Sequence, residues 1–295
     1  MFEALTQIGL PIALILIMAG VGLGLTPADF WRVFREPRAF LLGAFCQFLL
    51  LPLIALGVIA LTGLQGELAI GLFILALCPG GTTSNLYSLL ARADVGLSVS
   101  LTAVIGFITP FTIPLLAVWA IEFYGDGRAQ FELPIAKTWL QLMIITVVPV
   151  VVGMLIRGRW ERFALKMEPF ITRFSALVLL LLIISISVNL GSRIIDFAIQ
   201  AGPAAVLLNL ITMALGYFAG KALLHREAQA RAISLEVGLQ NGTLALLITT
   251  GILQSAEMSV APSIYSLVMF ISATLFTLWV LRQDRRRRFR GAAQA

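Results

Sequence analysis

Long apolar segments, separated by short polar stretches, run through the whole chain. A segment of about 20 mostly apolar residues is long enough to cross a bilayer as a helix. We identify nine such segments, at residues 5–25, 38–62, 66–92, 95–124, 135–156, 170–190, 203–223, 228–253 and 262–282. The pattern predicts an all-α polytopic membrane protein with nine transmembrane helices. Because further spans follow the first one, we expect it to stay in the mature protein rather than to be a signal peptide.

Two of these segments contain a polar, glycine-rich interruption near the middle. The third reads Cys78-Pro79-Gly80-Gly81-Thr82-Thr83-Ser84-Asn85, and the eighth is interrupted at residues 236–243. Proline removes a backbone donor and glycine weakens a helix, so each interruption should break its helix. Inside a membrane, non-helical backbone is tolerated only where it is buried in protein or lines a polar cavity. The sequence therefore predicts two discontinuous helices that build a site inside the bundle.

The two interruptions occupy corresponding places in a repeated pattern. Segments one to four (residues 1–124) and six to nine (residues 170–283) each contain two plain helices, a broken helix and a closing helix. The fifth segment and its loop (residues 125–169) make an odd crossing, so the two halves enter the membrane from opposite sides. Inverted repeats with paired broken helices are typical of secondary transporters, whose site lies between the breaks. We therefore expect residues 1–295 to form one transporter unit, ending in a basic tail at residues 284–295.

Composition and charge agree with this class. The chain has 295 residues, of which 59% are hydrophobic and 12% charged, whereas soluble domains are about a quarter charged. With the N-terminus placed outside, every Lys and Arg except Arg128, Lys137 and Arg193 falls in an inside segment. The positive-inside rule thus predicts an outside N-terminus and a cytoplasmic C-terminus, and it explains the net charge of +6 without nucleic acid. The short loops favour a multi-pass protein of a bacterial inner (plasma) membrane.

Glu236 is the one acidic residue well inside an apolar segment. A carboxylate at that depth is costly, and it normally faces a bundle interior or cavity and has a partner. Groups that carry oxygen are available on the same and neighbouring segments: Gln47, Ser98, Thr102, Gln240, Asn241 and the carbonyl groups around Val237 and Leu239. Hard oxygen ligands with one negative charge suit an alkali cation, above all Na⁺, and the chain has no Cys/His cluster or ATP-binding motif. A proton on Glu236 alone, and packing roles for single Ser, Thr or Gln side chains, are the alternatives.

At these residues the chain resembles the bile acid:sodium symporter family. The matching stretches are residues 78–85, 91–92, 97–102 and 236–241, and the resemblance covers nearly the whole chain. The resemblance implies a core domain with two crossed broken helices and a separate panel domain. It also implies two Na⁺ sites, with Val237 and Leu239 acting through their carbonyl groups. The first would consist of Ser84, Asn85, Ser98, Thr102 and Glu236, and the second of Gln47, Glu236, Val237, Leu239 and Gln240.

The resemblance also implies a place for the substrate. A small organic anion would lie near the beginnings of the two inner half-helices, at Gly81, Thr82, Thr83 and Asn241. The last span departs from the family pattern, because similar bacterial members carry a His-Asn pair where this chain has Met269-Phe270. This loss of polarity fits a different or more apolar substrate, or other polar contacts in place of the pair.

Together these observations predict a secondary active transporter that couples Na⁺, as two ions, to symport of a small organic anion by alternating access. The anion would be a carboxylate such as pantoate or a 2-oxo acid, or a bile-acid-like compound. The alternatives are a proton-coupled or uniport exporter of organic anions or metalloids, and a membrane sensor that binds a ligand without moving it. An enzyme is excluded, since one buried Glu without a nucleophile, second acid or metal cluster makes no catalytic site. The expected partners are the anion and the lipid bilayer, not nucleic acid, with the chain a monomer or weak homo-oligomer.

Overall fold

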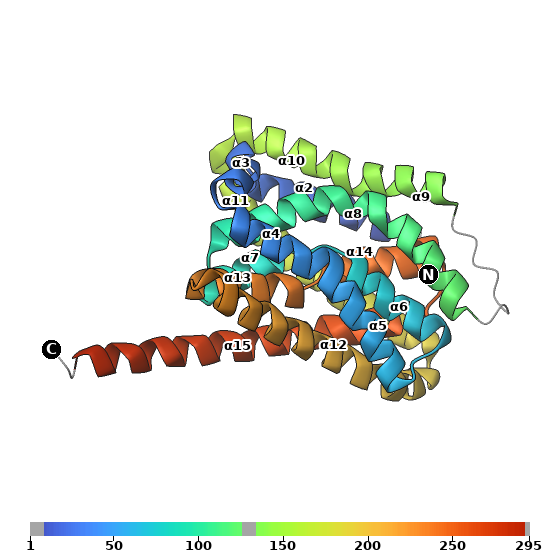
Figure 1. Ribbon diagram of the computed structural model, residues 1–295. Coiled ribbons are helices and arrows are strands. Elements are labelled where there is room, and N and C mark those ends of the chain that lie inside the picture. The colour runs from blue at the N-terminus through green and yellow to red at the C-terminus, as the bar shows by residue number, and fades with distance from the viewer. Residues whose placement is uncertain (1–8, 126–133, 293–295) are drawn as a thin grey trace.

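The protein is built from helices that cross the molecule from end to end (Figure 1). The computed structural model describes residues 9–125 and 134–292, apart from the side chains of residues 168 and 287–292. Within them, six helices are long and apolar enough to span a membrane: Pro37–Thr62, Val95–Tyr124, Ile135–Arg159, Glu161–Leu190, Arg193–Leu224 and Val260–Arg286. A pair of helices bent by 61°, Leu10–Gly24 and Pro27–Arg35, raises the number to seven. The prediction of an all-α polytopic membrane protein is confirmed.

Three parts of the sequence predictions lie outside the described residues. They are the start of the first predicted span, Arg128 in the charge count, and the last residues of the basic tail. The described elements other than the two broken helices are twelve helices and helical turns. They are α2 (Leu10–Gly24), α3 (Pro27–Arg35), α4 (Pro37–Phe45), the π-helical turn η2 (Cys46–Leu50), α5 (Leu51–Thr62), α8 (Val95–Tyr124), α9 (Ile135–Leu142), the π-helical turn η3 (Met143–Val147), α10 (Val148–Arg159), α11 (Glu161–Leu190), α12 (Arg193–Leu224) and α15 (Val260–Ala292).

Both predicted interruptions are breaks in the structure. The first separates α6 (Gly66–Leu77) from α7 (Thr82–Leu90). The second separates α13 (Glu227–Gly238) from α14 (Gly242–Leu246), which continues as the π-helix η4 (Leu247–Ile252). The helix α13 extends two residues past Glu236, and its backbone leaves the helical region only at Leu239 (φ −111°, ψ 85°). Glu236, which we expected inside the interruption, therefore stands on the last turn of a regular helix.

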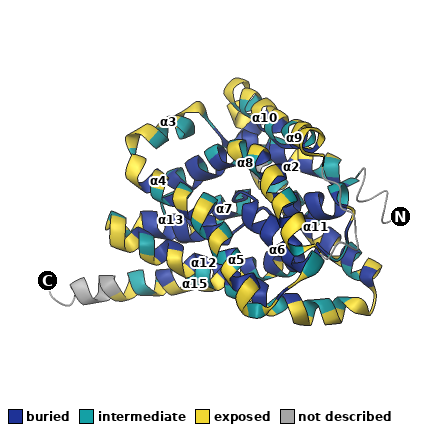
Figure 2. Ribbon diagram, turned by 45° about the vertical axis from the view of Figure 1, so that its right-hand side comes forward, coloured by how far each residue is buried: buried dark blue, intermediate teal, exposed yellow. Residues whose placement is uncertain are grey.

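The broken helices lie in the middle of the molecule (Figure 2). All residues from 68 to 77 in α6, from 229 to 238 in α13 and from 242 to 246 in α14 are buried. Two glycines of α12 let α13 approach closely, because a Cβ on Gly216 or Gly220 would meet the backbone of Ser234 or Ala230. Close packing through small residues is a main source of helix association in a bilayer. Lipid is thus kept away from both breaks.

A second set of helices, α2, α10 and α11, packs together at one side of the broken helices. We call this set the three-helix layer. Gly22 of α2 faces Gly153 of α10, and a Cβ on either residue would run into the backbone of the other helix. The layer faces the crossing of the broken helices through the small pockets described below.

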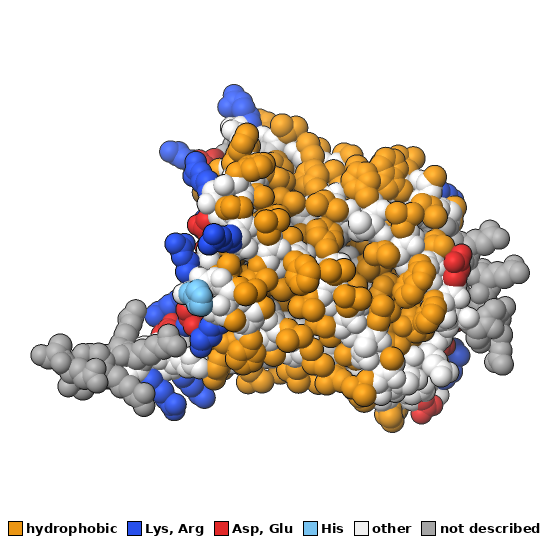
Figure 3. Space-filling view, in the orientation of Figure 1, with side chains coloured by type: hydrophobic (Ala, Val, Ile, Leu, Met, Phe, Trp, Pro, Cys, Tyr) orange, Lys and Arg blue, Asp and Glu red, His pale blue; other side chains and the backbone are white. Residues whose placement is uncertain are grey.

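Charged side chains gather at the ends of the bundle, and apolar side chains cover its middle (Figure 3). Lys and Arg are concentrated at the end where α3 and the C-terminal part of α15 lie. At the same end, Arg231 of α13 bonds both carboxylate oxygens of Asp284 in α15, at 2.6 and 2.9 Å, and the carbonyl of Ala91 at 3.0 Å. An apolar middle with polar ends fits a bilayer that the helices cross.

Candidate functional site

The two helix breaks cross each other, and backbone hydrogen bonds join them. The N–H of Asn241 donates to the carbonyl oxygen of Pro79 at 2.8 Å, and the N–H of Gly81 donates to that of Leu239 at 3.3 Å. Gly80 and Gln240 form an isolated antiparallel bridge at the same point. Each break therefore satisfies part of the backbone that the other one leaves without helical partners. As a result, the two breaks form one hydrogen-bonded unit.

The carboxylate of Glu236 lies at this crossing and is fully buried. Its Oε2 accepts hydrogen bonds from Ser84 Oγ at 2.8 Å and Ser98 Oγ at 2.9 Å, and its Oε1 accepts one from Thr102 Oγ1 at 2.6 Å. Asn85 Oδ1 lies 2.9 Å from Ser98 Oγ and 3.5 Å from Thr102 Oγ1. We call these five side chains the acid–hydroxyl cluster. They come from α7, α8 and α13, and they are the five residues of the first predicted ion site.

In the acid–hydroxyl cluster, the oxygen atoms that lie within hydrogen-bond distance of one another outnumber the hydroxyl hydrogens that could bond them. The single hydroxyl hydrogen of Ser84 has two acceptors within reach, Glu236 Oε2 and the Gly81 carbonyl oxygen at 2.7 Å. The hydroxyl groups of Ser98 and Thr102 each likewise approach both Glu236 and Asn85. Among the described residues, Glu236 has no ion pair with Lys, Arg or His. A buried negative charge ringed by oxygen atoms is an environment that a small cation stabilises.

The residues of the second predicted ion site also come together, but their polar groups bond one another. Gln47, on η2, donates from Nε2 to the Cys78 carbonyl at 2.9 Å and to Gln240 Oε1 at 2.8 Å. Gln240 Nε2 in turn donates to the Val237 carbonyl at 2.8 Å. The Leu239 carbonyl is taken by the N–H of Gly81. The amide hydrogens of Gln47 and Gln240 thus point at oxygen atoms of this same set, whereas the acid–hydroxyl cluster surrounds a carboxylate with hydroxyl groups that can rotate.

A small pocket lies where the two inner half-helices begin. The helix α7 starts at Thr82, and the helical stretch Gly242–Ile252 starts beside it across the crossing. Helix N-termini carry partial positive charge and free N–H groups, so they favour anions. All four residues of the predicted substrate site, Gly81, Thr82, Thr83 and Asn241, line this pocket. We call it the anion pocket.

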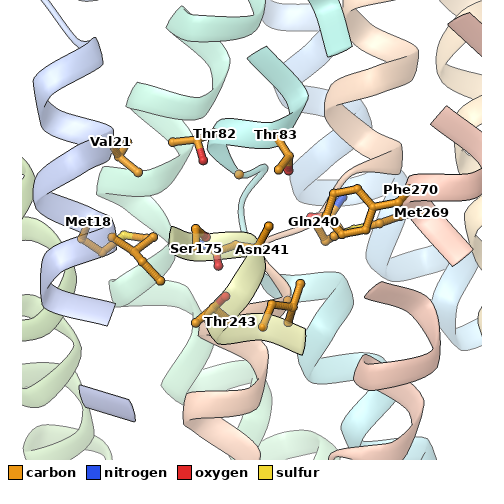
Figure 4. Close-up of a pocket in the computed structure, with 15 residues that line it drawn as sticks. Met18, Val21, Thr82, Thr83, Ser175, Gln240, Asn241, Thr243, Met269 and Phe270 are labelled. Atoms are coloured by element: carbon orange, nitrogen blue, oxygen red, sulfur yellow. The ribbon is translucent and has the colours of Figure 1, made fainter. Parts of the chain in front are cut away.

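Apolar side chains close the anion pocket on two sides (Figure 4). Met18 and Val21 of α2 lie on one side, and Met269 and Phe270 of α15 on the other, with the hydroxyl-bearing residues between them. The described residues provide no hydrogen-bond partner for the Nδ2 of Asn241, whose Oδ1 accepts from the Leu244 N–H at 3.0 Å. The pocket is thus lined by polar groups that lie between two apolar sides.

No group of three or more His, Cys, Asp and Glu that could hold a metal ion occurs in the described part of the chain.

Comparison with known proteins identifies the family. The model of the Sodium Bile acid symporter family matches residues 11–196, which is more than half of the chain. The chain belongs to this family. Its members are transporters, so this family member is a transporter rather than an enzyme.

Similar members of the family come from bacteria, plants and animals. A Bacillus subtilis protein described as an uncharacterized sodium-dependent transporter (YocS) is 26% identical over 90% of this chain and 80% of its own length. A probable sodium/metabolite cotransporter of Arabidopsis thaliana chloroplasts, BASS1, is 29% identical over 81% of this chain. Human sodium/bile acid cotransporter 4 is 30% identical over 90% of it. The chain spans 58% of the length of the plant relative and 62% of that of the human relative.

Two residues of this family member that sequence reasoning missed hold the second break in place. The carbonyl of Gly238, the last residue of α13, accepts hydrogen bonds from Asn209 Nδ2 at 2.9 Å and from the Tyr265 hydroxyl at 3.1 Å. Both side chains are fully buried. An amide and a phenol inside otherwise apolar spans were the available signal, since buried polar groups in membrane helices need partners.

Replacing Asn209 with alanine should destabilise the second break. The Gly238 carbonyl would keep only Tyr265 as a donor, and loss of a buried hydrogen bond typically costs about 1 kcal/mol. We expect a lower unfolding temperature in detergent for Asn209→Ala, and a further decrease when Tyr265→Phe is added. An unchanged unfolding temperature in the double variant would show that the two donors do not support the break.

Proposed function

We propose that this protein is a Na⁺-coupled symporter of a small organic anion, working by alternating access. One observation carries the proposal: the acid–hydroxyl cluster touches Gly80 of the crossing, and the anion pocket is lined by Gly81 and Asn241, whose N–H groups bond the two breaks together. The Bacillus, Arabidopsis and human relatives are described as a sodium-dependent transporter and as sodium cotransporters, which supports coupling to Na⁺. The nature of their solutes differs, so the solute is inferred from the pockets of this chain.

The helices support a nine-span arrangement with two inverted halves. The six long helices, the bent α2–α3 pair and the two broken helices each account for one crossing. On this proposal, residues 1–124 and 170–283 are the repeats, and the three-helix layer is the panel domain that faces a core of the remaining helices. Lys and Arg gather at one end of the bundle, which we assign to the cytoplasm, together with the C-terminus.

Na⁺ binding is assigned first to the acid–hydroxyl cluster of Ser84, Asn85, Ser98, Thr102 and Glu236. These are hard oxygen ligands around one negative charge, and the three hydroxyl hydrogens can rotate away when a cation enters. A second ion is assigned to Gln47, Gln240, Glu236 and the carbonyl groups of Val237 and Leu239, after rotation of both amides. The first ion should therefore bind to an almost preformed site, and the second should bind with a reorganisation cost.

The proposed coupling between Na⁺ binding and anion binding follows from the position of the acid–hydroxyl cluster. The carboxylate of Glu236 lies directly against the backbone of Gly80, so that a Cβ at this position would overlap Oε1. A bound cation would fix α7 and α13 relative to each other and thereby fix the residues at the crossing that line the anion pocket, Gly81 and Asn241 among them. Cation and anion then favour each other's binding, and such coupling is reciprocal. Two Na⁺ with one monovalent anion would carry net positive charge inward, aided by the membrane potential.

The structure also contains a route toward the basic end of the bundle. A cavity of about 370 Å³ lies between α2 and α11 on one side and α7 and α8 on the other. It shares Val21 and Thr82 with the anion pocket, and Arg173 also lines it. We assign this cavity as the path to the cytoplasm, with the cationic Arg173 attracting the anion during release.

Transport in proteoliposomes tests the proposal. Purified protein would be reconstituted, and uptake of labelled 2-oxoisovalerate or pantoate measured under a Na⁺ gradient, a pH gradient or neither. We expect uptake above the control only with the Na⁺ gradient, and more with an inside-negative potential. Uptake driven by the pH gradient would favour the proton-coupled reading. Specific binding of the acid without uptake under any gradient would favour a sensor.

A further inference from the structure

Arg231 is a buried cation on α13, the helix that also carries Glu236. Only 3% of Arg231 is exposed. A helix rises about 1.5 Å per residue, so the two residues lie about 7.5 Å apart along the helix axis. Removing a guanidinium from water is costly, and such a group normally keeps partners inside the protein. The partners of Arg231 therefore show which parts of the molecule it holds together.

The guanidinium of Arg231 joins α13 to two other elements. Its Nη1 and Nη2 donate to the two carboxylate oxygens of Asp284 on α15, at 2.9 and 2.6 Å. Nη1 also donates, at 3.0 Å, to the carbonyl of Ala91, the residue that follows the last turn of α7. Carbonyls at the end of a helix lack partners within it, and an Arg side chain can bond them. Arg231 thus caps α7, and Asp284 fixes the orientation of the guanidinium.

Ala91 begins the short connection between α7 and α8, residues 91–94, which we call the α7–α8 loop. At the other end of this loop, the N–H of Asp94 donates to the carbonyl of Ala228 in α13 at 2.9 Å, and the Asp94 carboxylate caps the first turn of α8. Between these ends, Arg92 has a φ of 54°, a left-handed conformation that a residue other than glycine keeps only where its surroundings hold it. Helix α13 therefore holds both ends of the α7–α8 loop.

The α7–α8 loop lies between the two helices that bring hydroxyl groups to Glu236. Ser84 and Asn85 precede it on α7, and Ser98 and Thr102 follow it on α8. The three hydroxyl groups lie between 2.6 and 2.9 Å from the carboxylate oxygens. A shift of the loop against α13 by about 1 Å would take these pairs beyond hydrogen-bond distance. Contacts that orient the ligands of an ion without touching it commonly change its affinity by about tenfold to a hundredfold.

We propose that Arg231 is a positioning residue of the ion site. It holds the α7–α8 loop against α13, with Asp284 as its anchor, and thereby sets the distance between Glu236 and the hydroxyl groups of the acid–hydroxyl cluster. Its guanidinium is not a ligand, because one cation repels another. This inference rests on the proposed Na⁺ site and adds a residue that controls the affinity of that site from outside it.

Three variants test how Arg231 acts. Arg231→Gln removes the guanidinium. Arg231→Lys keeps the charge but loses the planar fork that reaches Asp284 and Ala91 together. Asp284→Asn weakens the anchor and leaves Arg231 in place. Arg157→Gln is the control, because the ion pair of Arg157 with Glu161 lies within the three-helix layer.

Equilibrium binding of radioactive Na⁺ to the purified full-length protein in detergent would give the affinity and the amount bound, with choline chloride keeping the ionic strength constant. The unfolding temperature in choline chloride alone would report stability separately. We expect the Kd for Na⁺ to rise about tenfold in Arg231→Gln, less in Arg231→Lys and Asp284→Asn, and not in Arg157→Gln. The amount bound at saturation should stay unchanged, because every ligand remains. Adding Asp284→Asn to Arg231→Gln should raise the Kd no further, since Asp284 acts through Arg231.

A merely structural role would lower the unfolding temperature in choline chloride and leave the Na⁺ affinity of the folded protein unchanged. That result in Arg231→Gln overturns the inference. The affinity of the unmodified protein in Arg231→Lys also overturns it, because charge without the fork would then suffice. Should Arg231→Gln not fold, Arg231→Lys and Asp284→Asn decide by the same comparison. If the unmodified protein itself binds no Na⁺, the proposed function fails, and the inference falls with it.

Discussion

Replacing Glu236 with glutamine should abolish Na⁺-driven uptake. The substitution keeps the size of the side chain but removes the only formal charge of the acid–hydroxyl cluster. Opposite unit charges about 4 Å apart attract by about 4 kcal/mol at an effective dielectric constant of about 20, which corresponds to about a thousandfold in affinity. Uptake in proteoliposomes and Na⁺-dependent thermal stabilisation should both be lost, whereas weak binding of the acid without Na⁺ should persist.

The unfolding temperature of Glu236→Gln in the absence of Na⁺ is an internal control for folding. A buried carboxylate without a cation is unfavourable, so Glu236→Gln should unfold at the same or a higher temperature than the parent protein in choline buffer. The matched variant is Glu67→Gln, because Glu67 on α6 bonds the Ser255 hydroxyl away from the crossing. It should retain Na⁺-driven uptake. If Glu236→Gln transports with unchanged Na⁺ dependence, the cluster is not the ion site.

A methyl group at position 80 should impair the ion site through direct contact. A Cβ on Gly80 would overlap Oε1 of Glu236 and lie 2.8 Å from its carboxyl carbon. The carboxylate cannot simply turn aside, since three hydroxyl groups hold its two oxygens. Gly80→Ala should therefore weaken Na⁺ binding by about tenfold to a hundredfold, as expected for about 1–3 kcal/mol of overpacking.

Titration of the unfolding temperature with NaCl would measure this loss, since stabilisation follows the ratio of ligand concentration to Kd. Gly57→Ala is the control, because a Cβ at Gly57 meets nothing within 4 Å. Equal Na⁺ midpoints for Gly80→Ala and Gly57→Ala would contradict the close contact between the first break and Glu236.

Much of the architecture was predictable because a helix that crosses a bilayer requires a long apolar segment, which can be recognised in the sequence. Apolar segments of about 20 residues predicted the long helices, and proline and glycine predicted interruptions at residues 78–85 and 236–243. In the structure the helices break at residues 78–81 and 239–241. The main difference between prediction and structure concerns Glu236, which lies on the last turn of the regular helix α13 rather than in the break. Glycines at 238 and 242 flank the true break, and sequence alone does not tell which residue first leaves the helix.

A lone buried acid demands partners, which indicated oxygen-bearing side chains on neighbouring spans such as Ser98 and Thr102. The full set of five residues in the acid–hydroxyl cluster was implied by the resemblance to the symporter family. Other features depend on how distant helices pack. Nothing local in the sequence pairs Asn209 and Tyr265 with the Gly238 carbonyl, nor shows that Gln47 and Gln240 bond each other. Such contacts depend on how helices far apart in the sequence pack together, and the pattern of apolar and polar residues within one segment does not predict them.

The most direct measurement is calorimetric titration of the detergent-solubilised protein with 2-oxoisovalerate at several NaCl concentrations, with choline chloride keeping ionic strength constant. We predict a Kd for the acid that falls steeply as Na⁺ rises, and an equal fold-decrease in the product of the two Na⁺ dissociation constants when the acid is saturating. The same Kd for the acid in NaCl and in choline chloride would contradict the claim that the crossing of the two broken helices couples cation to anion.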